Sequence, residues 1–319
     1  MELINHTSYP SMMFRSAVEN DSLIASAILR VTYDIREDKV VPSPNQEWLL
    51  YKAPWESEYG PMEADQIFRL GGVDILVFGK ARPKNGLPAR NMDVSIKIEN
   101  KLSYSVRVFG NRFWEKNIFG MTISEPEPFS EMPLTLYNAY GGKADWDGLK
   151  LPYGNNPFGK GYYWEREDAI HKPLPNVEDP KDLVSKWNHR PDPVGIASCP
   201  MNELRMRGNV THNEKGMLKN VDARFFNTAF PSMIVPELVA GEEIRIEGML
   251  ATGPFFFKIP RHELKVRLRI GEKENERTLK ADQIGLIPDK MQAFITYRFP
   301  FRYKLQTLQV RKCEIIEIN

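Results

Sequence analysis

The chain has 319 residues, and its 43 basic and 42 acidic side chains give a formal net charge of +1 at pH 7. This balance excludes an overall electrostatic attraction to nucleic acid or to an anionic membrane. A hydrophobic fraction of 42% indicates a globular protein with a sizeable core, of a length that suits one large domain or two ordinary ones.

The cysteines and the N-terminal residues point to a cytoplasmic location. Cys199 and Cys313 are isolated from each other, which excludes a CxxC zinc or redox motif. The chain begins without the basic and apolar regions of a signal peptide, and its apolar runs are too short to span a membrane. We therefore expect a cytoplasmic protein.

The first third of the chain predicts strands. Residues 22–35 alternate at period two and are rich in β-branched side chains, which favours a strand over a helix. Residues 42–62 contain prolines and two tryptophans and are expected to form a long surface connection. The apolar run at 73–79 predicts a short buried strand.

An antiparallel hairpin is predicted next. Residues 92–99 and 103–108 both alternate between apolar and polar side chains, and Asn100-Lys101 separates them as a turn. Such alternation is typical of a sheet with one face on the core and one face in water.

The stretch from Phe129 to Tyr162 has little periodicity and is rich in glycine, proline, asparagine and aromatic residues. Glycine and proline oppose long helices, while the aromatic residues argue against disorder. We expect an ordered, irregular centrepiece. Pro133 is expected to begin a short helix that Gly141-Gly142 ends, and residues 179–187 are expected to form a helical turn.

Strand patterns return in the last third, at residues 243–250, 264–270, 278–281, 293–299 and 305–318. Short strands without long helices between them predict a mainly β fold, with antiparallel sheets arranged as a sandwich or a distorted barrel. We expect two β-rich halves, residues 1–124 and 201–319, joined by an irregular central segment at 125–200 that packs on both. One continuous domain is the alternative.

The most suggestive motif is Gly154–Gly161, which matches G-x-x-x-x-G-K. A P-loop needs Ser or Thr next, to bind magnesium, and this position is Gly161. It also needs a strand before the loop and a helix after it, whereas Pro152 precedes the loop and aromatic residues follow it. The motif therefore indicates a glycine-rich structural turn.

No catalytic or metal-binding motif emerges from the remaining residues. The histidines lack the spacing that places two imidazoles on one metal, and there is no G-x-S-x-G elbow. We expect no catalytic residue, no metal and no cofactor. The histidines in question are His6, His171, His189, His212 and His262.

Aromatic residues, 11% of the chain, cluster in the central segment and at Asp222–Asn227. One interpretation is that they fill the core between the two β halves. The other is that some are exposed and mark a surface for a protein partner or a glycan.

Five stretches in this order resemble a bacterial family, domain of unknown function 2169: PFSEMPLTLYNAYGG, NPFGKGY, LPNVEDP, PDPVGIA and DARFFNTAFP. The resemblance implies that the glycines and prolines shape the backbone and that some aromatics, or Arg224, contact a partner. The signature residues, which include the possible partner contacts, are Pro128, Phe129, Pro133, Leu134, Tyr140, Gly141, Gly142, Asn156, Pro157, Gly159, Gly161, Tyr162, Arg224, Phe225, Phe226 and Asn227. Four further positions match the family, Leu174, Pro175, Asn176 and Gly195.

Members of that family occur beside type VI secretion genes and are regarded as adaptors or chaperones. The resemblance thus implies a non-enzymatic protein that binds a protein effector, for example one with a spike-tip domain, and helps load it onto the spike protein. It implies no nucleic-acid or membrane partner. The alternative is a carbohydrate-binding or glycan-processing β-sandwich, with Trp146, Trp164 and Trp187 as candidate contacts. A third reading is an enzyme that acts on the effector's cell-wall target.

Overall fold

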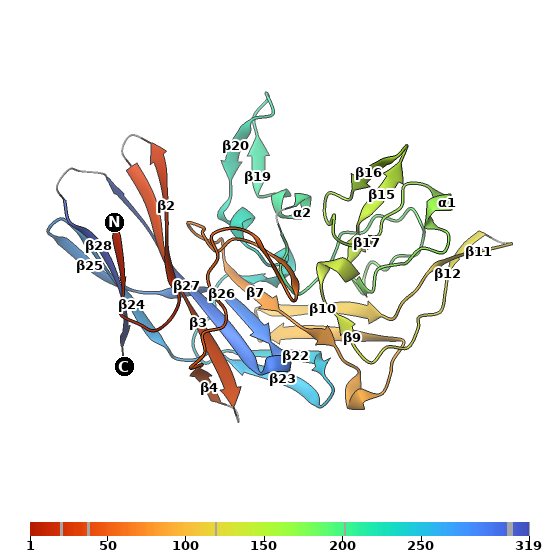
Figure 1. The fold of residues 1–319 in the computed structure, drawn as a ribbon, viewed down its shortest axis with the longest axis horizontal. Helices are drawn as coiled ribbons and strands as arrows, with labels where there is room; N and C mark the ends of the chain where they lie inside the picture. Colours follow the sequence, from red (N-terminus) through yellow and green to blue (C-terminus); the bar gives the residue numbers. More distant parts are fainter. Residues whose placement is uncertain (20–21, 37–38, 119, 201, 305–308, 319) are drawn as a thin grey trace.

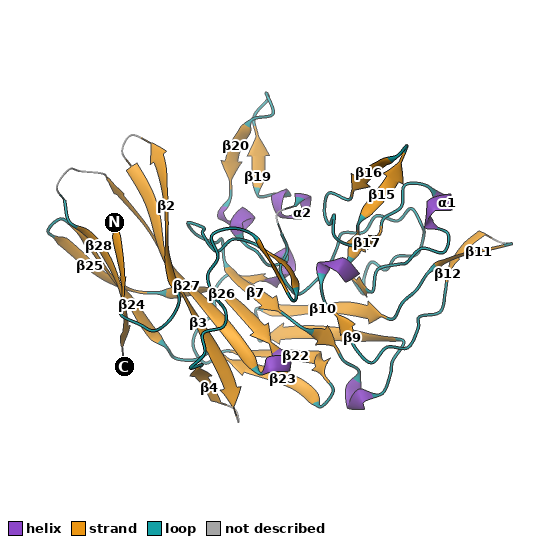
Figure 2. Cartoon of the chain, in the orientation of Figure 1, coloured by secondary structure: helices purple, strands orange, loops and turns teal. Residues whose placement is uncertain are grey.

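The computed structural model describes residues 1–319 except 20–21, 37–38, 119, 201, 305–308 and 319. Strands dominate it (Figure 2). The α-helices in the described residues are single turns, α1 (Arg166–Ala169) and α2 (Glu203–Met206). Most strand pairs are antiparallel, so the prediction of a mainly β, sandwich-like fold is confirmed.

The largest sheet has seven strands, in the order β2-β3-β27-β26-β7-β21, with β4 also paired to β3. The predicted strands at 22–35 and 73–79 are confirmed as β3 and β7. Strand β26 runs parallel to β7, and β27 pairs with β3 along its whole length. The strands are β2 (Ser11–Glu19), β3 (Ser22–Arg36), β4 (Lys39–Pro42), β7 (Val73–Val77), β21 (Ile234–Val235), β26 (Lys280–Ile287) and β27 (Gln292–Lys304).

The second sheet has five strands, in the order β18-β10-β9-β22-β23. Its β9–β10 hairpin is the one predicted, and Asn100 takes a positive φ of 57° in the turn. The alternation is also confirmed, because Val94, Ile96 and Ile98 point into the core. The strands are β9 (Asn91–Ile98), β10 (Leu102–Phe109), β18 (Val177–Glu178), β22 (Glu243–Leu250) and β23 (Gly253–Lys258).

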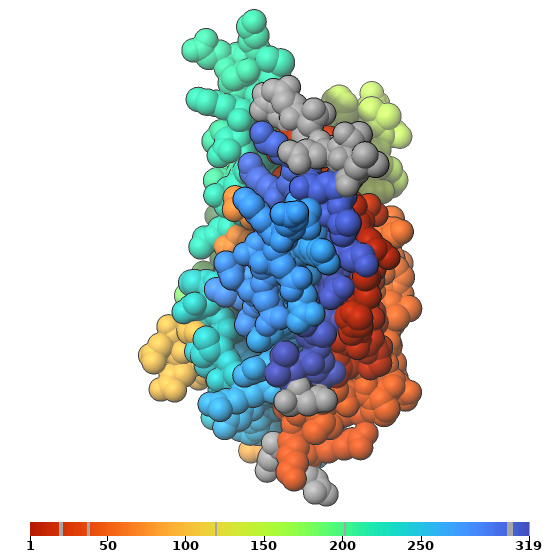
Figure 3. Space-filling view, turned by 90° about the vertical axis from the view of Figure 1, so that its left-hand side faces the viewer, coloured from red at the N-terminus to blue at the C-terminus, as the bar shows by residue number. Residues whose placement is uncertain are grey.

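The third sheet has four strands, in the order β1-β28-β24-β25, and brings the two ends of the chain together (Figures 1 and 3). Strand β1 runs parallel to β28. Residues 305–308 of the strand predicted at 305–318 lie outside the described residues. The strands are β1 (Glu2–Asn5), β24 (Glu263–Ile270), β25 (Lys273–Thr278) and β28 (Arg311–Ile318).

One hydrophobic core joins side chains from all three sheets. Trp48 lies in it, with ring centroids 5.4 Å from Phe78 and 4.8 Å from Phe294. The prediction that residues 42–62 form a surface connection is therefore wrong in part, because this segment covers the main sheet and buries Trp48, while Trp55 is half-buried. It also forms a small hairpin of β5 (Trp55–Ser57) and β6 (Gly60–Met62).

The central segment and Trp114, which precedes it, share a second, smaller core with Tyr140, Ala169, Leu174 and Val184. The helix expected after Pro133 shrinks to one 3-10 turn, η2 (Leu136–Asn138), because the chain then extends to pair β14 (Tyr140–Gly141) with β17 (Lys160–Gly161). Pro133 itself lies in β13 (Met132–Pro133), paired with β8 (Lys80–Ala81). Residues 179–187 form turns instead of the expected helical turn.

Three hairpins project from this body (Figure 1). They are β11 (Trp114–Asn117) with β12 (Gly120–Ile123), β15 (Lys143–Trp146) with β16 (Leu149–Pro152), and β19 (Val210–His212) with β20 (Leu218–Val221). The remaining 3-10 turns are η1 (Lys84–Gly86), η3 (Ala223–Phe226), η4 (Pro231–Met233) and η5 (Pro288–Lys290).

Candidate functional site

The β19–β20 hairpin, residues 210–221, projects from the body of the protein, and we call it the arm. It stands clear of the rest of the molecule in Figures 1 and 3. Every residue from Thr211 to Asn220 is exposed, so neither face of this two-stranded ribbon packs on the body. The arm nevertheless carries two large apolar side chains, Met217 at 58% and Leu218 at 62% exposure. Such side chains are available to a partner.

The root of the arm, residues 222–228, follows it directly in the sequence. Asp222 begins the η3 turn, and its side chain accepts a hydrogen bond of 2.8 Å from the Arg224 backbone N–H. This turn leaves Arg224 and Phe226 exposed and directs Asn227 and Thr228 inward. The root therefore combines side chains that are open to a partner with side chains that bind the core.

The anchor is Asp74, a fully buried residue of β7. Its carboxylate accepts hydrogen bonds from Asn227 Nδ2 at 2.7 Å, from the Thr228 N–H at 2.7 Å and from the Thr228 hydroxyl at 2.9 Å. Asn227 Oδ1 in turn accepts a bond of 2.8 Å from the Gly71 N–H. Burial raises the pKa of Asp74, and these bonds act in the opposite direction by stabilising the carboxylate.

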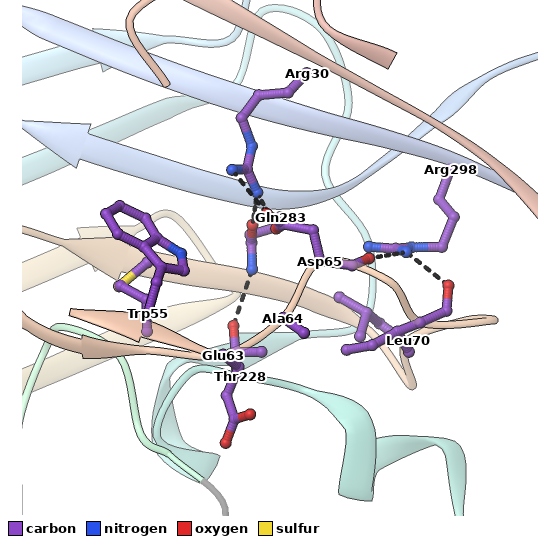
Figure 4. A pocket seen from close by; sticks show the side chains of 11 residues that line it. Arg30, Trp55, Glu63, Ala64, Asp65, Leu70, Thr228, Gln283 and Arg298 are labelled. Atoms are coloured by element: carbon purple, nitrogen blue, oxygen red, sulfur yellow. Dashed lines mark hydrogen bonds and ion pairs between the residues drawn. The ribbon is translucent and has the colours of Figure 1, made fainter. Parts of the chain in front are cut away.

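Polar contacts continue from the root across the main sheet (Figure 4). Gln283 donates to the Thr228 hydroxyl at 2.9 Å, and its Oε1 accepts from Arg30 at 2.9 Å. Arg30 also forms a buried ion pair with Asp65. Arg30 donates as well to the Leu49 carbonyl at 2.8 Å. The network therefore links β3, β26 and β7 with residues 49 and 65 and with the root, and it fixes the base of the arm to the core.

The cavity inside this network is too small for a substrate. It measures about 10 Å³, which is room for about one water molecule. Asp282 lies nearby, and burial raises the pKa of its carboxyl, although Arg298 donates a hydrogen bond to it. We interpret the network as structural support for the root.

The signature glycines of the central segment hold two stretches in backbone contact. Gly141 has φ +146° and Gly142 has φ +103°. A Cβ added at Gly141 would collide with the Asn156 carbonyl oxygen, and one added at Gly142 would lie 2.6 Å from that of Gly159. Asn156 is buried and donates to the carbonyls of Leu136 and Tyr140 at 2.9 and 3.0 Å. These residues shape the backbone.

The sixteen signature residues are thus distributed over two regions. Twelve of them build the central segment and four build the root of the arm. Those that are buried are Phe129, Leu134, Tyr140, Gly141, Gly142, Asn156, Gly161 and Asn227; those that are exposed are Pro128, Pro133, Arg224 and Phe226. Pro157, Gly159, Tyr162 and Phe225 are half-buried.

The P-loop-like stretch Gly154–Gly161 makes turns and ends in β17, so no helix begins at Lys160-Gly161, where a P-loop needs one. Helix α1 begins only at Arg166. The stretch is the structural turn that the sequence predicts. Within the described residues, no group of three or more His, Cys, Asp or Glu side chains is placed to hold a metal ion.

The aromatic residues of the central segment divide into buried and exposed sets. Trp187 is half-buried and packs against the small core. Trp146 and Trp164 are 46% and 44% exposed, and their ring centroids lie 6.2 Å apart with an interplanar angle of 57°. They form an apolar spot beside the β15–β16 hairpin.

Comparison with known proteins assigns the chain to a family. A match to the family described as an uncharacterized protein conserved in bacteria (DUF2169) covers residues 21–298. The chain belongs to this family. No curated protein and no solved structure matches it.

The DUF2169 match includes the arm, its root, the buried network and the central segment. It leaves β1, β2 and β28 outside. The candidate site therefore lies within the matched residues. None of the helices among its described residues has the length and apolar composition needed to cross a membrane.

Four candidate residues of this DUF2169 chain were not predicted from its sequence. Met217 and Leu218 lie in a polar stretch without alternation, so no strand was expected there. Arg205 and Arg207 come from α2, which is distant in sequence from Arg224 but faces the same cavity. The available signal was the basic residues that flank the arm in sequence, Arg205 and Arg207 before it and Arg224 after it.

Proposed function

We propose that this protein is a non-enzymatic adaptor that binds a type VI secretion effector and assists its loading onto the spike. The proposal rests on the sequence resemblance to adaptors of this kind. The observation that carries it is the arm, which exposes Met217 and Leu218 on a projecting ribbon with a rigidly anchored root.

Such an adaptor would act through binding alone, without catalysing a reaction. Full burial of a Met or Leu side chain at an interface contributes roughly 1.5–3 kcal/mol. Met, Phe and Arg are enriched at protein interfaces, and all occur on the arm or its root as Met217, Phe226 and Arg224. A root held by Asp74 reduces the entropy that is lost when the surface is ordered on binding.

The proposal places the protein in the bacterial cytoplasm, where an effector would be bound before export. Its partners would be the effector and the spike protein. Neither nucleic acid nor a membrane is needed, in keeping with the net charge of +1.

Co-purification tests the proposal. The tagged protein is isolated from a lysate of its native bacterium, and the bound proteins are identified by mass spectrometry. We expect a toxin, with or without a spike-tip domain, and the spike protein. Recovery of the protein alone, in folded form and high yield, would contradict the adaptor function.

A second candidate function is glycan binding, which the exposed pair Trp146 and Trp164 favours. The angle of 57° between the rings means that they do not form one flat platform, so each would stack on a separate sugar ring. A glycan array compares the native protein with the Trp146→Ala/Trp164→Ala variant. Glycan binding that disappears in this variant would support this function over the adaptor.

A further inference from the structure

A cavity of about 200 Å³ lies at the root of the arm, and three arginines line it. They are Arg205 and Arg207, from α2 and its C-cap, and Arg224 from η3. None of the described residues that line the cavity is acidic. The volume is below the roughly 300 Å³ at which small-molecule sites begin, and it suits a single side chain.

Two of the three guanidinium groups already have carboxylate partners. Arg205 is buried and pairs with Glu63 at 2.9 Å, and it also donates to the Phe225 carbonyl at 2.8 Å. Arg207 is 59% exposed and forms two bonds to Asp192, of 2.6 and 3.0 Å. Both charges are therefore compensated within the chain.

Arg224 differs from them. Within the part of the chain that the structure describes, its guanidinium has no hydrogen-bond or ion-pair partner. Its stem is nevertheless held in place, since a Cβ added at Gly71 would lie 2.5 Å from Arg224 Cγ. The backbone beneath it is fixed by Asp222 and by the Asn227–Gly71 bond. The result is a positioned cation without a counter-charge.

We propose that this cavity binds the side-chain carboxylate of an acidic segment of a protein partner, with Arg224 as the residue that pairs with it. One uncompensated guanidinium matches the single charge of a carboxylate better than the nearly double charge of a phosphate. Its planar fork can donate two parallel bonds to a carboxylate. Ala229 and Ile234 supply an apolar wall for the methylene groups of a glutamate.

This inference rests on the proposed adaptor function, because it names the chemistry by which the root would recognise a partner. It adds an electrostatic contact to the apolar contacts of Met217 and Leu218 on the arm. An acidic segment would then bind at the root while apolar side chains beside it pack on the arm.

The test uses the full chain and a defined probe, an amidated peptide of three Gly-Glu repeats. The arginine Nε–H signals of ¹⁵N-labelled protein are followed by NMR during titration, and the Arg224→Gln variant assigns the Arg224 signal. We expect this signal to shift with the Gly-Glu peptide and to stay unchanged with a Gly-Gln peptide. Arg224→Gln should weaken binding by about tenfold or more, the typical effect of losing a charged hydrogen-bond pair.

Arg277→Gln is the matched control, because Arg277 is an exposed arginine of β25 on another sheet. It removes the same charge and should leave the affinity unchanged. Arg224→Lys keeps the charge and loses the fork, so it should lie between wild type and Arg224→Gln. Thermal unfolding of each variant checks that the fold is retained.

Equal peptide affinities of the Arg224→Gln and Arg277→Gln variants would overturn the carboxylate site, as would equal binding of the Gly-Glu and Gly-Gln peptides. A Gly-Gln peptide with a free C-terminus that binds as well as the amidated Gly-Glu peptide would overturn the assignment to a side chain. These results are independent of co-purification. The adaptor function fails if no effector or spike protein is recovered, whatever the peptide does.

Discussion

The carboxylate of Asp74 accepts two hydrogen bonds from Thr228, one from its backbone N–H at 2.7 Å and one from its hydroxyl at 2.9 Å. Asp74 lies in β7, between β26 and the edge strand β21 of the chain's largest sheet, and Thr228 ends the root of the arm. A surface element is thus fixed to the core through one buried carboxylate.

Asp74→Ala should lower the free energy of unfolding by about 3 kcal/mol, because it leaves Asn227 and Thr228 as buried donors without an acceptor. The change in the free energy of unfolding is measured by urea unfolding. Asp93→Ala is the control, since Asp93 forms an exposed ion pair with Arg107 and should cost about 1 kcal/mol or less. Equal losses for the two variants would refute the anchoring role.

Gly141→Ala should destabilise the central segment by at least about 3 kcal/mol. The new Cβ would meet the Asn156 carbonyl, and φ would remain at +146°. Gly148→Ala is matched to it, because Gly148 has φ +78° and open space around it, so only about 1–2 kcal/mol of backbone strain is expected. Thermal unfolding followed by tryptophan fluorescence compares them. A Gly141→Ala protein as stable as the Gly148→Ala protein would contradict the backbone contact described above.

Both cysteine thiols should be unreactive in the folded protein. Burial raises the pKa of Cys199 from 9.0 to about 11 and that of Cys313 from 9.0 to about 12, so little thiolate is present at pH 8. A thiol reagent such as DTNB should react slowly in buffer and rapidly in denaturant. Fast reaction of either thiol under native conditions would show that it is accessible.

The same two thiols predict how stability depends on pH. Their folded pKa values exceed the unfolded value of 9.0, so the folded state holds these protons more tightly. Their contribution is fully present below pH 9 and is lost as the pH rises through about 11 and 12. The urea midpoint should fall over this range, and it should fall less in a Cys199→Ala/Cys313→Ala variant. An identical pH dependence of the two proteins would argue against these shifts.

Removing the arm should leave the fold intact. Replacing residues 212–219 by Asn-Gly keeps the Thr211–Asn220 pair and closes the hairpin with a favoured two-residue turn. Because the removed side chains are exposed, the free energy of unfolding should change by less than about 0.5 kcal/mol. A larger loss in urea unfolding would mean that the arm supports the body.

The sequence was sufficient to predict the strands that have regular alternation. β3 and the β9–β10 hairpin follow directly from side chains that repeat at period two. The arm escaped prediction because both of its faces are in water, so its sequence carries no apolar alternation.

The buried polar network around Arg30 and Gln283 was not predicted either, for a different reason. Arg30 sits in the β3 pattern like a solvent-facing residue, yet it is buried against Gln283, which is 253 positions away. No local pattern reports a contact over that separation. The DARFFN stretch was identified from its composition and family resemblance. Only the structure shows that Arg224 is exposed while Asn227 is buried and donates a hydrogen bond to Asp74.

The most direct test of the account is quantitative co-purification from the native bacterium with the wild-type protein and the variant in which Asn-Gly replaces residues 212–219. The account predicts that the wild type recovers the effector together with the spike protein, and that the arm variant, equally stable, recovers at most a tenth as much effector. Equal recovery of the effector by the two proteins would contradict the claim that the arm is the surface that binds it.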